Sequence, residues 1–190
     1  MKLFARLGFA ALFVSAFAMF QPAFAADEPD SIVVLAKHAP DPKPDDPVQV
    51  KFEKFKVVKA SFDAKKIEGA KATIEIDPAS LKSGSDKRDA HLNSPDLLDS
   101  KKFPKITVDI DKVKKKTGNT YAAEATVKYR DITKKYPVTF DVVDAKDDAL
   151  KIKGETAFSR YDFNVGGKDL SKLPVSPDLT IKLNLTLKKS

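Results

Sequence analysis

The residues best suited to chemistry fall in one short stretch, where Arg88, Asp89 and His91 lie close together in the chain. A guanidinium, a carboxylate and an imidazole could together bind a polar head group or carry out acid–base chemistry. The same residues have a structural alternative, in which Arg88 and Asp89 fix an irregular loop and His91 hydrogen-bonds a backbone carbonyl. The sequence leaves both interpretations open.

Other signals of catalysis are missing from the sequence. It contains no Cys, no Gly-x-Ser-x-Gly elbow and no His-Glu-x-x-His helix. Its two His residues, His38 and His91, lie far apart in the chain, which gives little reason to expect a metal site. We therefore expect neither an enzyme nor a metal or other cofactor.

The elements that must position these residues are short segments in which apolar and polar side chains alternate. Residues 179–187 show the pattern most clearly, and a period of two is typical of antiparallel strands with one buried and one solvated face. Similar segments occur at residues 31–37, 48–57, 70–76, 106–110, 123–129, 132–142 and 150–158. About eight strands at short, regular spacing predict an all-β barrel or sandwich.

Two irregularities interrupt this pattern. The alternation slips by one residue at Lys54, which predicts a β-bulge or a sharp bend. The alternation is lost over residues 83–100, where Ser94-Pro95-Asp96 combines a helix cap, a first-turn proline and a first-turn acid. We expect one short helix there.

The inward faces of these strands carry almost only apolar side chains, so the interior is either an apolar tunnel or a solid core. Small residues at Ala70, Ala72, Ala123, Ala125 and Gly154 favour a cavity, because bulk is missing there. The predicted ligand-binding residues are Phe52, Phe55, Ile74, Ile76, Val108, Val127, Tyr129, Val138, Phe140, Phe158, Ile181 and Leu183.

The first 25 residues have the form of a secretory signal peptide. Lys2 and Arg6 precede an uncharged apolar run that ends at the small-x-small site Ala23-Phe24-Ala25. The run is too short for a membrane span, and the lack of Cys excludes a lipoprotein signal. We expect cleavage before Ala26 and a single domain over residues 26–190.

Three motifs then appear in order along the chain. Residues 85–99 and 103–108 resemble the signature of the YceI-like family of secreted polyisoprenoid-binding proteins, which has an Arg-Asp-x-His-Leu segment, a short helix and an aromatic-Pro step into a strand. Residues 125–142, with residues 129–135 at the turn, are similar to the family's hairpin that ends in a Thr-Lys-x-Val-type strand. Residues 158–163 are similar to its Arg-x-Asp-Phe element, with Asn164 where the family has Gly.

The resemblance implies a lipocalin-like antiparallel β-barrel with one short helix, enclosing a long isoprenoid chain. It also implies a periplasmic location and no catalysis. The residues expected at the tunnel mouth or in a lid are Arg88, Asp89, His91, Leu97, Leu98 and Phe103, although the last three could equally plug one barrel end as an ordinary apolar cluster.

The function we expect is that of a periplasmic carrier or reservoir that holds a polyprenyl lipid or a quinone. The alternative is an envelope stress or interaction protein with a filled barrel, acting through its basic surface; a cavity below about 300 Å³ would favour it. The net charge of +7 suits weak contact with anionic membranes, whereas scarce Arg and absent Trp argue against nucleic acid. The sequence does not decide whether the protein forms a homodimer.

Overall fold

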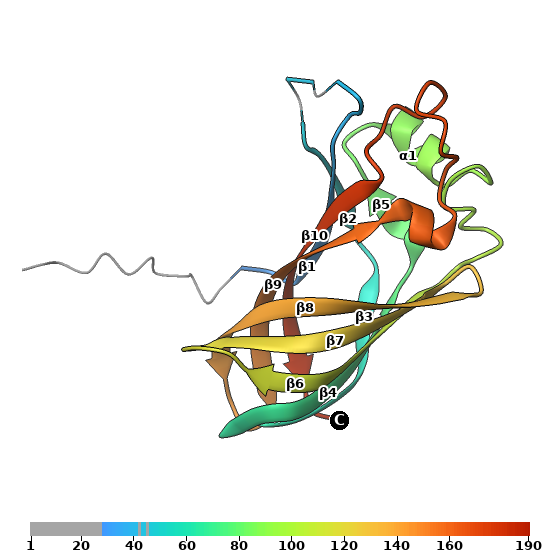
Figure 1. Ribbon diagram of the computed structural model, residues 1–190. Coiled ribbons are helices and arrows are strands. Elements are labelled where there is room, and N and C mark those ends of the chain that lie inside the picture. Colours follow the sequence, from blue (N-terminus) through green and yellow to red (C-terminus); the bar gives the residue numbers. More distant parts are fainter. Residues whose placement is uncertain (1–27, 42, 45) are drawn as a thin grey trace, which may run out of the picture.

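The computed structural model describes residues 28–190 except residues 42 and 45, so the predicted signal peptide lies outside the described residues. One curled antiparallel sheet forms most of this part of the chain (Figure 1). Its strands are β1 (Ser31–Ala36), β2 (Val48–Phe52), β3 (Phe55–Asp63), β4 (Lys66–Ile76), β5 (Leu81–Lys82), β6 (Ile106–Lys115), β7 (Thr120–Tyr129), β8 (Ile132–Ala145), β9 (Ala149–Ser159) and β10 (Asp178–Lys188).

The sheet order is β3-β4-β6-β7-β8-β9-β10-β1-β2-β5, so most neighbouring strands are joined by hairpins. The helical elements are α1 (Asp86–Leu92) and the 3₁₀-helices η1 (Pro78–Ser80) and η2 (Arg160–Phe163). In the part of the chain that the structure describes, no helix is both long and apolar enough to cross a membrane.

The strand number differs from the predicted one for two reasons. The segment predicted as one strand over residues 48–57 is broken at Glu53 and Lys54, so that β2 and β3 are separate strands, as the slip at Lys54 indicated. The second extra strand, β5, has only two residues, which is too short to show any alternation. The all-β prediction is confirmed.

The corner between β2 and β3 joins the two edges of the sheet. β3 lies at one edge, and β2 lies beside β5 at the other, so the chain steps directly across the seam. Ser80 holds this corner: its Oγ accepts from the N–H of Lys54 (2.9 Å), its carbonyl accepts from the N–H of Glu53 (3.2 Å), and its Oγ donates to the carbonyl of Asp77 (2.7 Å). These bonds fix the corner by which the chain passes from one edge of the sheet to the other.

A single short α-helix is present, as predicted, but its predicted position at Ser94 is wrong. The helix α1 begins after Ser85, whose Oγ accepts a hydrogen bond from the N–H of Arg88 (3.4 Å), and its first turn is acidic. After Ser94 the chain makes only turns, which continue to residue 102, and the positive φ of Asp99 (49°) interrupts them. The cap signal at Ser94 therefore starts a segment too short to become a helix.

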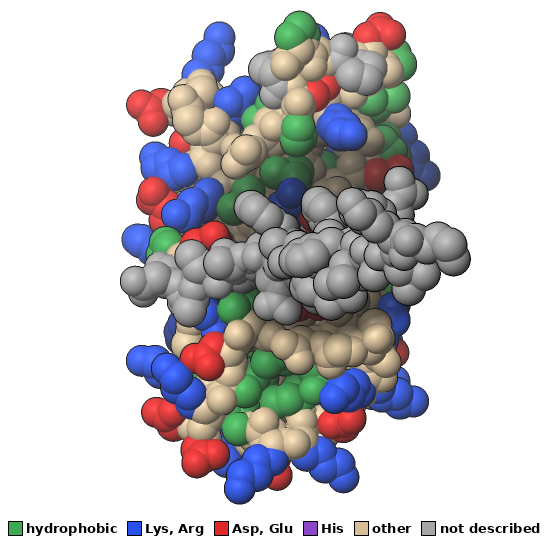
Figure 2. Space-filling view, turned by 90° about the vertical axis from the view of Figure 1, so that its left-hand side faces the viewer, with side chains coloured by type: hydrophobic (Ala, Val, Ile, Leu, Met, Phe, Trp, Pro, Cys, Tyr) green, Lys and Arg blue, Asp and Glu red, His purple; other side chains and the backbone are tan. Residues whose placement is uncertain are grey.

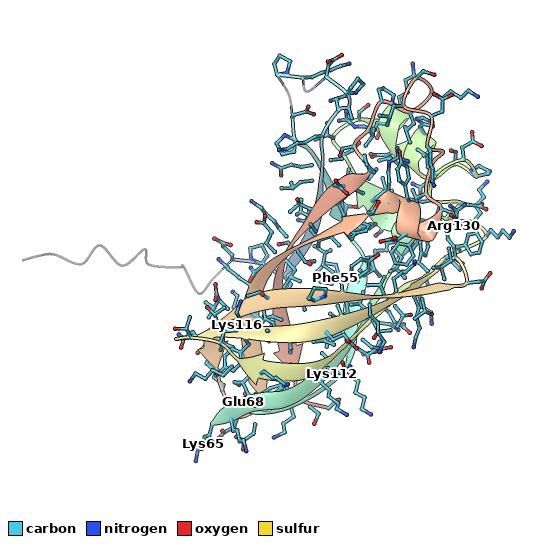
Figure 3. The ribbon with its side chains drawn as sticks, in the orientation of Figure 1. Phe55, Lys65, Glu68, Lys112, Lys116 and Arg130 are labelled. Carbon is cyan, nitrogen blue, oxygen red and sulfur yellow. The ribbon has the colours of Figure 1, made fainter. Side chains whose placement is uncertain are left out.

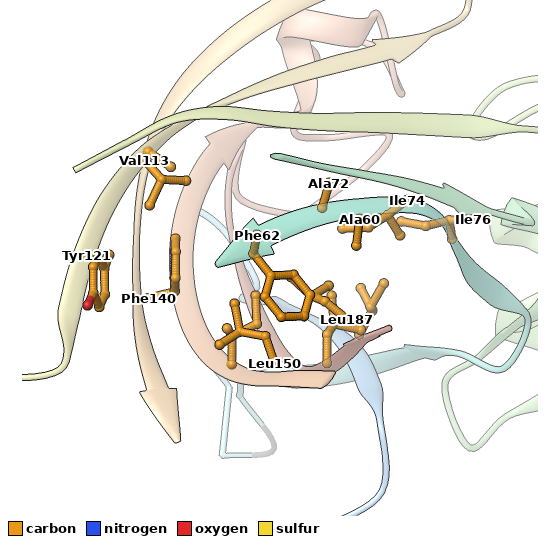
Figure 4. Packing of buried hydrophobic residues seen from close by; sticks show 14 of the residues in the cluster. Ala60, Phe62, Ala72, Ile74, Ile76, Val113, Tyr121, Phe140, Leu150 and Leu187 are labelled. Atoms are coloured by element: carbon orange, nitrogen blue, oxygen red, sulfur yellow. The ribbon is translucent and has the colours of Figure 1, made fainter. Parts of the chain in front are cut away.

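The two ends of the barrel differ (Figure 3). One end, which we call the lid end, carries α1, η2 and the β7–β8 turn with Arg130. The opposite end, which we call the blind end, carries the β3–β4 and β6–β7 turns, marked by Lys65 and Lys116. A layer of fully buried side chains packs across the blind end, with Phe62, Leu150 and Leu187 in mutual proximity (Figure 4).

We expect truncations in the two regions to differ in cost. Leu150 is 1% exposed within the blind-end layer, so Leu150→Ala should lower the free energy of unfolding by about 3 kcal/mol, since it removes apolar contacts and leaves a new void. Leu183 is only half-buried in the middle of the barrel, so Leu183→Ala should lower the free energy of unfolding by only about 1 kcal/mol. Urea denaturation measures both, and equal losses would show that the middle of the barrel is packed as tightly as the blind end.

Candidate functional site

The interior of the barrel contains an elongated cavity with an almost wholly apolar lining. Its walls come from β1, β2, β4 and β6 to β10, and the loops of the lid end cover it. Of the predicted ligand-binding residues, those that line it are Phe52, Ile74, Ile76, Val108, Val127, Tyr129, Val138, Phe140, Phe158, Ile181 and Leu183.

The cavity volume is about 280 Å³, just below the range of about 300–1,000 Å³ found for ligand pockets. By the criterion of about 300 Å³, volume alone narrowly favours the filled barrel. The side chains give a second observation. In the middle of the barrel, Val108, Val127 and Val138 line the cavity yet are only half-buried, because part of each side chain borders free space.

Small residues contribute to this space unequally. Ala70, Ala72 and Ala125 line the cavity, as their lack of bulk predicted. At Gly154 the space is taken instead by its cross-strand neighbour Phe140. A Cβ at Gly154 would lie 3.1 Å from the Cβ of Phe140, so this glycine allows the aromatic residue to pack closely against β9.

Phe55 is the one predicted ligand-binding residue that the structure places outside the cavity. It follows the corner after β2, where it packs against the edge of the core and borders a shallow surface groove. The alternation alone did not reveal this, because Phe55 pairs with the cavity residue Ile76 and so has the same phase as the inner face.

Aromatic rings gather at the lid end of the cavity. Phe163 lies 6.4 Å from Tyr129, 6.3 Å from Tyr136 and 6.5 Å from Phe158, measured between ring centroids, and all four rings line the cavity. Such separations suit edge-to-face and tilted contacts. Sequence reasoning did not include Tyr136 and Phe163 in the site, although Tyr136 shares the phase of Val138 on β8.

Both tyrosine hydroxyls at this end already have partners. The hydroxyl of Tyr129 donates to the carbonyl of Leu98, and that of Tyr136 donates to Oδ2 of Asp162 (2.9 Å). Burial raises the pKa of Tyr129 to about 12, and burial together with Asp162 raises the pKa of Tyr136. Both tyrosines are therefore neutral at physiological pH and present ring faces to the cavity.

Arg160 is the cationic centre of the lid end, and sequence reasoning missed its role. Its side chain is almost fully buried and donates to backbone carbonyls of Val165 (2.8 Å), Gly167 (3.1 Å), Val175 (3.0 Å) and Ser176 (3.3 Å). Burial lowers the pKa of its guanidinium. Arg160 thus shapes the segment 164–177, which covers the cavity as a lid.

Arg88, Asp89 and His91, the residues that the sequence singled out for possible chemistry, do not line the cavity. Asp89 is buried, and its Oδ1 accepts from the N–H (2.8 Å) and hydroxyl (2.6 Å) of Ser83, while Arg88 donates to the Ser83 carbonyl (2.8 Å). His91 is exposed on α1. The arrangement of Arg88 and Asp89 is that of the structural alternative, in which they fix the loop before α1.

The three apolar residues predicted to form a lid lie in different places. Leu97 and Leu98 line the cavity from the loop after α1. Phe103 lies outside it, with its ring 6.2 Å from that of Tyr129 and 5.3 Å from the guanidinium of Arg130. Phe103 therefore supports the wall from behind.

A search of the described residues for metal sites found no group of three or more His, Cys, Asp or Glu side chains that could hold an ion. His38 instead pairs with Asp46, whose Oδ1 lies 2.7 Å from its Nδ1. The pair spans the proline-rich loop after β1, and a bridge between His38 and Val175 connects that loop to the lid.

Comparison with known proteins identifies the family to which this chain belongs. The sequence profile of the YceI-like domain family matches residues 31–187. This chain belongs to that family. Among curated relatives, a UPF0312 protein of Pseudomonas putida is 27% identical over 129 residues, which cover 64% of this chain and 66% of the relative. A UPF0312 protein of Vibrio campbellii is 30% identical over 110 residues, covering 55% and 58%. The matched region spans less than two thirds of each of these relatives.

Solved structures share the fold. Burkholderia cenocepacia BcnA is similar with a TM-score of 0.72 at 23% identity, over 83% of this chain and 95% of that one. A Campylobacter jejuni YceI protein gives 0.68 at 18%, over 79% and 90%. A polyisoprenoid binding domain from Saccharophagus degradans, implicated in plant cell wall breakdown, gives 0.65 at 12%, over 85% and 94%. The predicted lipocalin-like barrel is confirmed.

We expect Asp89 to make the stability of the YceI-like domain depend on pH. Hydrogen bonds from Ser83 hold the pKa of Asp89 below its ordinary value, with Lys82 3.6 Å away adding to the effect. Because this pKa is lower in the folded chain than in the unfolded chain, the carboxylate stabilises the fold above about pH 4, and this contribution is lost as the pH falls through the folded-state pKa.

Urea denaturation of Asp89→Asn at several pH values tests this contribution. The variant should be less stable than the wild type at neutral pH, and the difference should shrink at acidic pH. His91→Ala is the matched control, because the exposed side chain should leave the unfolding midpoint unchanged. A difference for Asp89→Asn that does not change with pH would contradict the assignment.

Proposed function

We propose that this protein is a secreted, periplasmic binding protein that holds a long-chain isoprenoid, either a polyprenyl lipid or an isoprenoid quinone, inside its barrel. It would serve as a carrier or reservoir rather than as an enzyme. One observation carries the proposal: inward-facing apolar side chains in the middle of the barrel keep accessible surface along one continuous apolar cavity.

The energetics of such a cavity favour an apolar chain. Burial of each methylene group contributes about 0.8 kcal/mol, so a long tail gains affinity along its whole length without any polar contact. The shared fold with the polyisoprenoid binding domain of Saccharophagus degradans supports the same ligand class by analogy.

The lid end favours a neutral ring as the head group. The guanidinium of Arg160 and the hydroxyls of Tyr129 and Tyr136 are already hydrogen-bonded within the protein. The tyrosines therefore present their ring faces to a ligand, and Arg160 contributes a fixed positive charge rather than a free hydrogen-bond donor. A quinone head could stack among the four rings, whereas a phosphate would need donors that are committed elsewhere.

The alternative, an envelope interaction protein with a filled barrel, is supported only by the modest volume of the cavity. Its basic surface is not concentrated: Lys56 and Lys105 flank Glu75, and Lys112 and Lys135 flank Glu124. Figure 2 shows basic and acidic side chains interspersed over one face of the molecule. Such a surface gives little electrostatic focus for a partner.

The periplasmic location rests on residues 1–25, whose charged start, apolar run and Ala23-Phe24-Ala25 site have the form of a cleaved signal peptide. Fractionation of cells that produce the full chain tests this part. A soluble periplasmic protein that begins at Ala26 is the expected product, and an uncleaved chain retained in the cytoplasm would contradict it.

Mass spectrometry of an organic extract tests the ligand. The mature protein, purified from the envelope of its own organism, should release an isoprenoid in close to one-to-one ratio. An empty extract, combined with no uptake of added polyprenol or quinone, would overturn the proposed function in favour of the filled barrel.

Filling the cavity should weaken binding without adding a buried charge. Leu183→Trp places a large ring in the middle of the cavity, so we expect the affinity for an added isoprenoid to fall about tenfold or more, or about 1.4 kcal/mol. Lys182→Trp is the matched control, because the neighbouring side chain is exposed on the outer face and pairs with Glu155 (3.7 Å). Equal uptake by both variants would refute the cavity as the binding site.

A further inference from the structure

We propose that Phe62 is a plug that limits how long an isoprenoid tail the barrel accepts. The inference rests on the proposed lipid-binding function and adds a selection for tail length, set at the blind end. It makes Phe62 a specificity-determining residue, although it does not itself line the cavity.

The cavity extends along nearly the whole of β10. Every second residue of that strand lines it, namely Leu179, Ile181, Leu183, Leu185 and Leu187. These residues span eight steps of about 3.3 Å, or about 26 Å along the strand, and the depth along the barrel axis is smaller because barrel strands are tilted. At the blind end, the lining residues Val113, Phe140 and Leu187 are buried.

The two ends of this space are closed in different ways. At the lid end, the lining residues Leu98, Val165 and Leu173 are only half-buried and belong to loops. At the blind end, Phe62 and Leu150 are buried behind the cavity and belong to paired strands. A tail therefore enters at the lid end and points towards Phe62.

The local structure of β3 explains why Phe62 lies there. A register shift between Val57 and Lys59 changes the phase of the strand, so that Ala60 and Phe62 are buried while Val58 is exposed. Ser190 then holds this part of β3 to the end of β10: its N–H donates to the Ala60 carbonyl (3.0 Å), and its Oγ accepts from the Ala60 N–H (3.1 Å).

Phe62 also lies close to a charged side chain near the surface. Figure 4 shows its ring beside Leu150 and Leu187, the second of which lines the cavity. The ammonium group of Lys189 lies 5.9 Å from the centroid of the same ring, and a charged group of this kind remains close to solvent. Phe62 is therefore one of the side chains that separate the end of the cavity from the outside.

A close-packed layer of this kind does not yield to an incoming chain, because inserting extra carbon atoms forces side chains out of their rotamers. A tail that is longer than the cavity must fold back or remain outside the lid. Affinity should consequently rise with tail length only up to a limit.

Native mass spectrometry with a series of polyprenols, lengthened by one isoprene unit at a time, tests the plug. For the wild type we expect uptake to increase with length and then to stop increasing at a defined length. Phe62→Ala should move this limit to longer tails by at least one unit. Val113→Phe, which adds bulk on the cavity side of the blind end, should move it to shorter tails and keeps the test valid if Phe62→Ala does not fold.

Phe55→Ala is the matched control, since it removes the same aromatic group from the same strand outside the cavity and should leave the limit unchanged. A limit that is identical in the wild type and in every folded blind-end variant would overturn the role of Phe62, while the lipid-binding function would stand. Failure of the wild type to take up a polyprenol or an isoprenoid quinone of any length would overturn the proposed function, and the plug with it.

Discussion

Closure of the barrel depends on a few hydrogen bonds around Ser80. The residue lies in η1, between β4 near one edge of the sheet and β5 at the other, and it binds the backbone of the corner at Glu53 and Lys54. These bonds satisfy backbone groups that the break between β2 and β3 would otherwise leave unpaired. An antiparallel sheet with open edges exposes strands for pairing with other chains, so closure protects the protein as well as enclosing space.

Closure also decides what becomes of the apolar faces. Each strand turns one face inward, and a barrel of this size can fill its centre or leave it open. In this barrel one end is filled and the middle is left open. The blind end is packed like an ordinary core around Leu150, and the middle leaves Val108, Val127 and Val138 in contact with free space. The packed end supplies stability, and the open middle gives up some of that stability in return for space.

The architecture was predictable because period-two alternation is a local signal that each strand carries by itself. The slip at Lys54 likewise located the corner. The predicted start of the helix at Ser94 was wrong, since a capping signal is also local but says nothing of how far the following helix can extend, and Asp99 stops it. The inward residues of the central strands were placed in the cavity by phase alone, and their role in binding stays a prediction.

Other features could not be derived from the pattern. Phe55 has the phase of an inward residue, but the edge position of β3 removes it from the cavity. The surroundings of Arg88 and Asp89 depend on Ser83, which is close in sequence but carried no distinctive signal. Arg160 escaped notice because its partners are backbone carbonyls of a loop, and every residue type presents the same carbonyl.

That loop has a mechanical property that follows from the guanidinium at its centre. A guanidinium is planar and rigid, and its donors have fixed directions. The carbonyls of Val165, Gly167, Val175 and Ser176 are held by this one group, so none can shift without misaligning its bond, and the ring of Tyr161 stacks 4.5 Å from the same charge. The two ends of the segment 164–177 are thus tied to each other and to η2 through a single buried side chain.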